Sequence, residues 1–534
     1  MSRPRLAVLT LCMLPIITSA VRAQDKPLRQ IIDAEIKAAW QREKITPATR
    51  ADDAMFLRRV HLDIVGTIPT AAEVRIFLKD ADPQKRAKLI DRLLDDPRFA
   101  THQANVWDMV LFGRNPAGYD LTRKRDGFKK WLTEQFAKNQ GYDHLVRDLL
   151  LAEQDGPDLF YVQYRSAPEE ATVAVSRIFL GTQLQCARCH DHPFEAWTQK
   201  DFYGMAGFFV RLVVTDGAGM KKYGIGEKST GEVLFTGAVK DQKPGQKGEP
   251  IKPKFLGGPA LNEPALPADF KEVPPGAKKL PKPVFSRKQQ LAEWVVAPTN
   301  PFFAPAIANR VWAQYMGRGL GHPVDDLGEK SDISHRELLK AMAAQMTAHK
   351  FDLKWFIREL VNSETYQLAA TGGGTDALPK WHEWGRVRPL SAEELMISIR
   401  VAVNYDGDKQ PGSTPLDDNG EAYFLRYFGE PTNGIGDFQG SLHEHLFLNH
   451  SSNVRRLIQR KKGNLADLVL TEKEPWEQRV EHMFVSVLGR LPKPAETKRF
   501  VTHLTSDKDP KAADALVEEA IWVLLNTAEF RFNH

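Results

Sequence analysis

The sequence contains few cysteines, no long apolar run beyond its first residues and no large excess of either charge. Its 534 residues include three cysteines, Cys12, Cys186 and Cys189, which excludes a disulfide-rich scaffold. After residue 23, no stretch reaches the roughly 18 apolar residues that a membrane helix needs, so we expect no integral membrane span in the mature chain. The net charge of +5 is small for this length and gives no argument for a nucleic-acid partner.

Residues 1–23 are predicted to be a secretory signal peptide. Arg3 and Arg5 supply the positive start, and Leu6 to Ile17 is an apolar run of suitable length. Val21-Arg22-Ala23 is an acceptable cleavage site, so Cys12 leaves with the signal. We therefore predict a periplasmic or secreted protein, in a compartment where a disulfide or an attached haem can form.

Composition and length predict a large globular protein made mainly of helices. Hydrophobic residues make up 42% and charged residues 26% of the chain, the balance of an ordinary folded protein. Because 534 residues exceed the size of one hydrophobic core, we expect two to four domains. Residues 211–285 are instead rich in Gly, Lys and Pro, with short β-prone pieces between turn residues. The predicted division is a signal at 1–23, a helical domain at 24–210, a β-hairpin or small-sheet insert with a linker at 211–285, and a helical domain at 286–534.

Several helix ends can be located from capping residues. Gly66 follows the apolar helical stretch 56–64 and is a predicted C-cap. Three pairs of a hydroxyl residue and an acidic residue have the capping-box spacing, which marks a helix start. They are Thr70 with Glu73, Thr198 with Asp201, and Ser334 with Glu337.

Some segments far apart in the chain resemble each other. Residues 56–73 and 484–496 both contain an apolar helix, a glycine, a proline-containing turn and a new helix with Glu in its first turn. Residues 104–107 also resemble 308–312, and residues 141–149 resemble 350–360. The matches do not keep one order along the chain. A permuted duplication and the chance recurrence of common helix-ending signals both account for them.

The stretch that carries chemistry is Cys186-Ala187-Arg188-Cys189-His190, followed by Asp191-His192-Pro193. Two thiols separated by two residues, with a histidine directly after the second, form the attachment pattern of c-type haem. In this interpretation Cys186 and Cys189 form thioether bonds and His190 ligates the iron. Met205, on the helix that follows, is a candidate ligand for the opposite face of the iron.

Two other interpretations of the same turn stay open. The side chains of Cys186, Cys189, His190 and His192 are ligand types that suit zinc, although four ligands in one short turn are cramped. A disulfide between the two cysteines would pin the turn without any cofactor. Four aromatic residues flank the motif and could house a flat apolar ligand. They are Phe179, Phe194, Trp197 and Phe209.

Other polar residues are interpreted as structural. We expect solvated or capping roles for His61, Asp63, His102 and Asp108. Asp325 and Asp326 are adjacent, and we expect exposure or turn formation there rather than paired acid–base chemistry. They belong to a polar cluster in the second half together with Asn309, Arg310, Trp312 and His335.

Three groups of residues carry a resemblance to a known family. They are Leu57-Arg58-Arg59 with Leu62-Asp63, Gly66 and Pro69-Thr70; Cys186 with Cys189-His190-Asp191-His192-Pro193; and Ala308-Asn309-Arg310-Val311-Trp312 with Asp325-Asp326 and His335. The chain resembles large exported proteins abundant in planctomycetes, in which a cytochrome-associated domain precedes a planctomycete-specific domain, both of unknown function. The resemblance implies domains at residues 30–210 and about 285–530, and it implies an electron-transfer setting without a defined substrate.

The leading functional hypothesis is an exported haem-c-binding redox protein, either an electron carrier or a subunit of an oxidoreductase. Its expected partner is a cytochrome or another exported redox protein. One alternative is a non-catalytic scaffold with zinc or a disulfide at the cysteine turn. Another is a polysaccharide-active enzyme with Asp325 or Asp326 as the acid, for which the sequence offers no motif. Whether the chain is an enzyme is left open by the sequence.

Overall fold

The computed structural model describes residues 26–113, 125–216, 223–237, 241, 243, 248–274, 280–373, 378–405, 446, 448–507 and 509–534. The predicted signal at residues 1–23, with Cys12, lies outside these ranges. Within them the protein is mainly α-helical, as predicted. No helix in the described ranges is both long enough and apolar enough to cross a bilayer.

The first part of the chain is a series of helices with no strand among its described residues up to 206. Their amphipathic faces arise from apolar residues at helical spacing, which is the pattern that the sequence shows. These elements are α1 (Leu28–Glu43), α2 (Asp53–Val65), α3 (Ala71–Lys79), α4 (Lys85–Asp95), α5 (Pro97–Phe112), α7 (Arg125–Lys138), α8 (Tyr142–Leu151), α9 (Asp158–Val162), α10 (Pro168–Leu180), the short 3₁₀ helix η2 (Gln185–Arg188) and α11 (Gln199–Ala206).

The predicted β insert is present and consists of two short antiparallel pairs. Strand β1 (Leu212–Asp216) pairs with β2 (Tyr223–Glu227), and β3 (Val233–Phe235) pairs with β4 (Glu249–Ile251). A third pair, which the sequence did not reveal, joins β5 (Arg388–Pro389) to β6 (Phe532–Asn533) near the end of the chain. This last pair brings residues 143 and 145 positions apart together beside α2.

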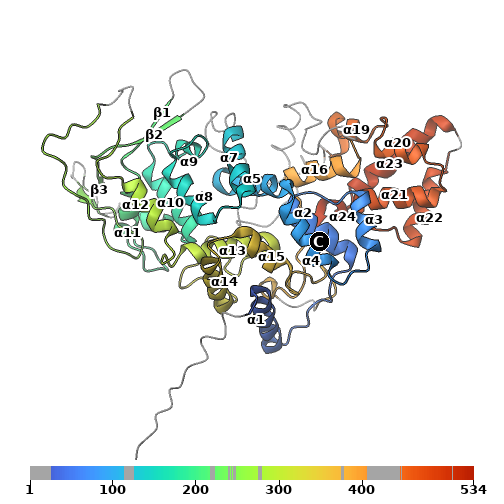
Figure 1. Ribbon diagram of the computed structural model, residues 1–534, viewed down its shortest axis with the longest axis horizontal. Helices are drawn as coiled ribbons and strands as arrows, with labels where there is room; N and C mark the ends of the chain where they lie inside the picture. The colour runs from blue at the N-terminus through green and yellow to red at the C-terminus, as the bar shows by residue number, and fades with distance from the viewer. Residues whose placement is uncertain are drawn as a thin grey trace, which may run out of the picture.

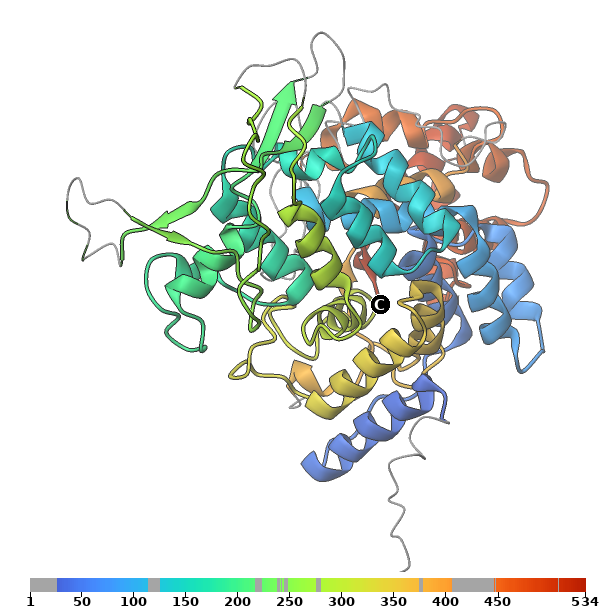
Figure 2. The same ribbon diagram turned by 60° about the vertical axis from the view of Figure 1, so that its left-hand side comes forward.

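Helices resume after the insert. They are α12 (Arg287–Val296), α13 (Phe303–Met316), α14 (Arg336–Ala348), α15 (Leu353–Val361), the 3₁₀ helix η4 (Pro379–Trp381), α16 (Ala392–Ala402), α19 (Ser452–Ile458), α20 (Leu465–Thr471), α21 (Trp476–Leu488), α22 (Pro494–Leu504), α23 (Pro510–Leu525) and α24 (Ala528–Arg531). Figure 1 shows α16 and α19–α24 gathered with α2–α4 at one end of the molecule. The strands β1–β3 and helices α9–α12 form the other end, and the turned view in Figure 2 shows the same separation.

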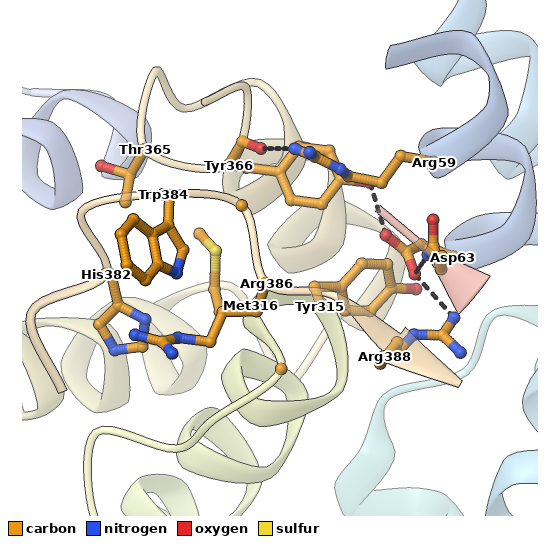
Figure 3. Close-up of a pocket in the computed structure, with 13 residues that line it drawn as sticks. Arg59, Asp63, Tyr315, Met316, Thr365, Tyr366, His382, Trp384, Arg386 and Arg388 are labelled. Carbon is orange, nitrogen blue, oxygen red and sulfur yellow. Dashed lines mark hydrogen bonds and ion pairs between the residues drawn. The ribbon is translucent and has the colours of Figure 1, made fainter. Parts of the chain in front are cut away.

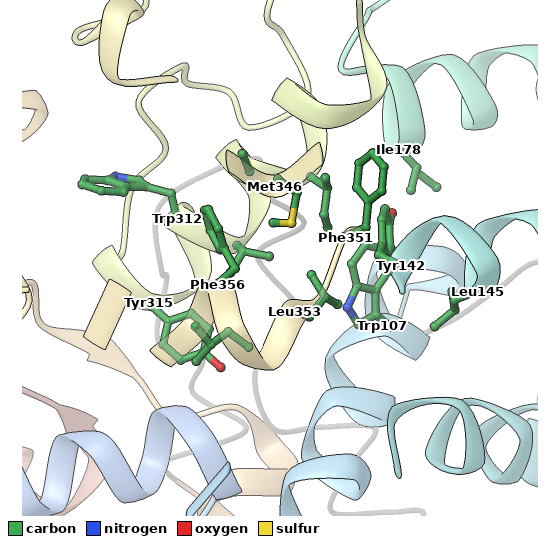
Figure 4. Close-up of a cluster of buried hydrophobic side chains, with 14 of the residues drawn as sticks. Trp107, Tyr142, Leu145, Ile178, Trp312, Tyr315, Met346, Phe351, Leu353 and Phe356 are labelled. Atoms are coloured by element: carbon green, nitrogen blue, oxygen red, sulfur yellow. The ribbon is translucent and has the colours of Figure 1, made fainter. Parts of the chain in front are cut away.

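Two hydrophobic cores hold these helices, and neither follows the predicted domain ranges. The larger core combines buried residues from α1–α11 with residues from α12–α15 and the segment up to Ala369. In Figure 4, Trp107 and Tyr142 from the first half lie close to Phe351 and Leu353 from the second. The smaller core combines α16 and α19–α24 with Leu62 and Ile68 from the start of the chain. Both cores therefore join segments from the two ends of the sequence.

The predicted helix ends are confirmed in most cases. Gly66 ends α2 in the left-handed conformation, and the Thr70–Glu73 and Thr198–Asp201 capping boxes begin α3 and α11. The prediction for Ser334 is wrong, because α14 begins one residue later with His335 at its N-cap. The Ser334 hydroxyl donates instead to the Leu320 carbonyl, 3.2 Å away. A tertiary contact therefore replaces the local cap.

Candidate functional site

The cysteine turn is a short connection between two buried helices. Helix α10 ends at Gly181, which has a φ of 57°. The next three residues lead into η2, which contains Cys186, and Cys189 follows in a right-handed helical conformation. Pro193 has no backbone N–H to continue a helix, and the Thr198 capping box then begins α11. The two thiols therefore lie on one helical turn, held between elements that are themselves fixed by the larger core.

Both thiols of this turn are free and accessible. Cys186 and Cys189 are exposed and are not joined to each other, which differs from the disulfide interpretation of the turn. Between them Ala187 is fully buried and anchors the turn to the core. The side of the turn that carries sulfur therefore faces solvent.

His190 is exposed beside the thiols, and its two ring nitrogens have different roles. Its Nδ1 atom lies 2.7 Å from the Asp191 carbonyl oxygen. A carbonyl oxygen can only accept a hydrogen bond, so Nδ1 carries the proton and donates it. In the neutral ring, Nε2 then has a free lone pair. This is the arrangement in which a histidine can ligate a metal through Nε2 while its other nitrogen orients the ring.

His192 has the opposite arrangement. Its Nδ1 atom accepts from the backbone N–H of Glu195 at 2.9 Å and of Phe194 at 3.3 Å. Because Nδ1 accepts, the proton of the neutral ring is on Nε2, and neither nitrogen is free to ligate. His192 thus caps the loop that follows the motif. The geometry gives no support to its predicted role as a metal ligand.

The aromatic residues around the motif do not enclose it. Phe179 and Phe209 are buried in the larger core, whereas Phe194 is 68% exposed. Trp197 packs edge-on against Phe302 of the second half, with ring centroids 6.1 Å apart. Met205 is fully buried while His190 is exposed, so the structure offers no support for Met205 as the second iron ligand.

Polar contacts fix the turn on both sides. On one side Arg188 forms an ion pair with Glu170 of α10 at 2.7 Å, and its carbonyl accepts from the Tyr203 hydroxyl. On the other side the Glu195 carboxylate accepts from the backbone N–H groups of Glu329 and Lys330. The cysteine segment is therefore bound directly to a loop of the second half. Among the described residues, no group of three or more His, Cys, Asp or Glu side chains is arranged to hold a metal ion.

The polar cluster predicted in the second half is structural. Asp325 is buried and pairs with Arg177 of α10 at 3.2 Å. Of the two roles expected for it, exposure is therefore wrong, but it does lie in a turn, across which Asp326 N donates to Pro323 O. Asp326 instead accepts from the Ser331 hydroxyl within its own loop. Asn309 bonds the backbone of Gly321 and Val324. The two adjacent aspartates thus have separate partners.

A second polar centre, which the sequence did not reveal, is built around Asp63 (Figure 3). Its carboxylate accepts from the Tyr366 hydroxyl at 2.7 Å, from Arg388 Nη2 at 2.8 Å and from Asn533 Nδ2 at 2.7 Å. Arg388 also pairs with Glu394, at the start of α16. The prediction that Asp63 is solvated or capping is wrong, because it is 4% exposed in the last turn of α2 and bonds side chains of distant segments. His61, His102 and Asp108 are also buried.

Charges in this centre are matched to one another. Burial opposes ionisation of Glu394, but the Arg388 guanidinium outweighs it and lowers the pKa of Glu394 to about 2. Burial also lowers the pKa of His102, which lies 3.9 Å from Glu394. The sequence signal for this centre was a lone aspartate within an apolar helix. Its partners, more than 300 residues away, could not be identified from that signal.

Two family models match separate parts of the chain. Residues 31–213 match the family model PSCyt2, described as a protein of unknown function (DUF1549). Residues 287–419 match the model PSD1, described as a protein of unknown function (DUF1553). The chain contains these two domains in tandem. No curated protein and no solved structure matches it.

The two domains divide the candidate sites between them. The DUF1549 domain contains the cysteine turn and Asp63, and the DUF1553 domain contains Arg388, Glu394 and the loop that binds Glu195. The buried polar centre and the Glu195 contact therefore both join one domain to the other. The family descriptions name no cofactor, so the association with a cytochrome stays a prediction.

Proposed function

We propose that the protein is an exported redox protein that carries a c-type haem on the turn formed by residues 186–190. The observation that supports this most is the combination at one exposed turn of two free thiols and a histidine whose Nδ1 is already bonded. These are the groups that haem attachment needs, in the protonation arrangement that it needs. When bound, the haem supplies one-electron chemistry at its iron.

The chain's own residues have distinct roles in this proposal. Cys186 and Cys189 would hold the porphyrin through two thioether bonds, which form by addition of a thiol to a vinyl group and need no oxidant. His190 would ligate the iron through Nε2, and the Asp191 carbonyl keeps the ring in the tautomer that leaves this nitrogen free. The ion pair of Arg188 with Glu170 and the docking of Glu195 hold the turn in place.

The exposure of the turn favours electron transfer to another protein over catalysis in an enclosed pocket. A haem held by exposed cysteines keeps part of its edge at the surface, where a redox partner can approach closely. We therefore propose an exported cytochrome or similar carrier as the partner. The two alternatives are a zinc ion at the same turn and a purely structural role.

The test is to produce the full chain with its signal in a bacterium that attaches haem to exported proteins. We expect a Soret absorption band and a haem stain that survives denaturing electrophoresis, because the bond is covalent. The double variant Cys186→Ser/Cys189→Ser is expected to lose both signals. A colourless wild-type protein would contradict the proposal, and a stoichiometric zinc content would favour the alternative.

A matched pair of histidine variants separates the two imidazoles. His190→Asn removes the Nε2 ligand, so the spectrum of the reduced iron should change. His192→Asn places an amide oxygen where Nδ1 accepts its two backbone hydrogen bonds, so the spectrum should stay as in the wild type. Equal changes in both variants would show that His190 has no special role.

A further inference from the structure

One loop of the second domain, residues 325–330, contacts the cysteine segment at both of its ends. Before the thiols, the backbone N–H of Leu327 donates to the carbonyl of Gly181 at 2.9 Å. After the thiols, the Glu195 carboxylate accepts from two successive backbone N–H groups of the same loop, at 3.2 and 3.0 Å. The loop therefore restrains the whole segment that contains the two cysteines and the histidine between them and Glu195.

The contact at Glu195 is a close fit that depends on Gly328. A Cβ atom at position 328 would overlap the Glu195 carboxylate, because the carboxyl carbon would lie only 2.6 Å away. The φ of Gly328 is outside the left-handed region, so glycine is needed here for space and not for backbone conformation. The two N–H groups and the missing side chain together form a seat for one carboxylate.

The loop is itself fixed to the helices of its own domain. Asn309 of α13 donates to the backbone at the start of the loop, and Arg336 of α14 donates to the carbonyl of Glu329 at 3.2 Å. Asp325 is buried and also accepts from Gln183, at 3.3 Å, on the side of the first domain. A carboxylate seated on this loop is therefore held by a well-anchored part of the second domain.

A single peptide group carries this restraint on to His190. The peptide group between Asp191 and His192 donates its N–H to Trp197 O at 2.8 Å. The C=O of the same group accepts from His190 Nδ1 at 2.7 Å. Because a peptide group is planar, its N–H and C=O turn together. Whatever holds the N–H side in place therefore also keeps the acceptor in front of His190 Nδ1.

The second domain holds this peptide group from two positions. Trp197, which accepts the N–H, packs its ring against Phe302 at the start of α13, with ring centroids 6.1 Å apart. Glu195, two residues earlier, is seated on the 325–330 loop, and its own backbone N–H donates to His192 Nδ1 at 2.9 Å. The contacts form a continuous path from the second domain to the imidazole of the candidate iron ligand.

We propose that the second domain positions the iron ligand of the first. Glu195, seated on the loop, fixes the peptide group between Asp191 and His192, and this peptide group keeps the proton of His190 on Nδ1. Glu195 is thus a positioning residue, which touches no iron but decides which nitrogen of His190 is free to ligate. This role rests on the proposed function, because a free Nε2 matters only where it binds a metal such as haem iron.

The test is nuclear magnetic resonance of the full chain, made without haem and with ¹⁵N-labelled histidine, at a pH well above the usual histidine pKa of about 6.5. The ring nitrogen shifts distinguish the Nδ1–H from the Nε2–H form, and His190→Asn assigns the signal. We expect the Nδ1–H form of His190 in the wild type and a loss of that form in Gly328→Ala and in Glu195→Ala. Gly127→Ala is the control and should leave the signal unchanged, because a Cβ atom there meets no atom within 4 Å.

A double variant separates this path from a general loss of structure. Gly328→Ala acts by displacing the Glu195 carboxylate, so it should cause no further change when Glu195→Ala has already removed that carboxylate. A full additional change in the double variant would overturn the positioning role. So would a wild-type His190 that carries its proton on Nε2, or a His190 signal that is the same in every variant.

The exported, haem-loaded chain gives a second readout, which separates this role from haem attachment itself. We expect the midpoint potential of the haem to shift in Gly328→Ala and to stay unchanged in Gly127→Ala. Equal potentials in both variants and the wild type would contradict the positioning role and leave haem attachment intact. A colourless protein in which the His190 tautomer still responds to Gly328→Ala would contradict haem attachment and support the positioning role.

Discussion

Asp63 is the residue on which the junction of the two domains depends. It accepts three hydrogen bonds, from residues that are 303, 325 and 470 positions away in the sequence. One of these donors, Arg388, is charged and is shared with Glu394. A buried carboxylate with all its hydrogen bonds made holds its partners in place. Removing one partner leaves a buried charge without compensation, which destabilises the folded state.

We predict that Asp63→Asn lowers the free energy of unfolding by about 2–4 kcal/mol. The asparagine keeps the size of the side chain but turns one acceptor into a donor facing other donors. The change is measured by urea denaturation. Asp91→Asn is the control, because Asp91 is 56% exposed where it pairs with Arg358 and should lose less than about 0.5 kcal/mol. Equal losses in the two variants would contradict the role assigned to Asp63.

At the residue scale, the sequence predicts local chemistry and misses distant partners. The cysteines and His190 were identified because their spacing alone specifies a chemistry. The hydrogen bond from His190 Nδ1 to Asp191, which decides which nitrogen is free, needed the backbone conformation. Asp63 looked like an ordinary polar residue of a helix, because nothing near it in sequence marks Tyr366, Arg388 or Asn533 as its partners.

Two helix-ending glycines show how the same local signal can have different surroundings. Gly66 and Gly489 end α2 and α21 with almost identical backbone angles, φ of 70° and 71°. They occupy matching places in the two segments that resemble each other in sequence. A Cβ atom on Gly66 would lie 2.4 Å from His102 Nδ1, whereas one on Gly489 would have no atom closer than 3.8 Å.

We predict that Gly489→Ala costs about 1 kcal/mol of stability, from the left-handed conformation alone. Gly66→Ala is destabilised by the same conformational effect and must also displace the buried ring of His102. Its free energy of unfolding should therefore fall clearly more. Thermal or urea unfolding of the two variants gives the comparison. If Gly66→Ala loses no more than Gly489→Ala, the close packing of α2 against His102 is not as described.

At the element scale, most of the fold was predictable because helix ends are encoded locally. The capping boxes at Thr70 and Thr198 and the glycine at 66 were read correctly from the sequence. The strand pair β5–β6 was not, since each strand is two residues long and the paired residues lie 143 and 145 positions apart. Two of the segments that resemble each other in sequence are in contact, since Tyr142 N donates to Phe351 O.

On the scale of the whole molecule, the two domains share their cores. The larger core joins helices from both, and the smaller one includes Leu62 and Ile68 of the first domain among helices near the end of the chain. Composition could indicate the β insert and the lengths of the helical segments on either side of it. It could not indicate which helical faces meet, because the apolar face of an amphipathic helix does not specify which other helix it packs against.

Buried histidines make the whole protein sensitive to mild acid. Burial lowers the pKa of His102, His335, His382 and His534, that of His335 to about 4. The unfolded chain therefore binds protons near pH 6.5 that the folded chain does not bind. Stability is fully present above that pH and is lost as the pH falls.

We predict that the free energy of unfolding falls between pH 7 and pH 5.5, with His335 alone contributing about 1 kcal/mol of the loss. His335→Gln should show a smaller loss over this interval than the wild type. Urea unfolding at the two pH values measures both. A stability that rises or stays constant on acidification would contradict the neutral, buried state of these rings.

The most direct test of the central proposal is the intact mass of the exported protein after unfolding. The proposal predicts the mass of the mature chain plus one haem, and the mass of the chain alone for Cys186→Ser/Cys189→Ser. A wild-type mass equal to that of the bare polypeptide, or lower by two hydrogens, would show that the turn carries no haem.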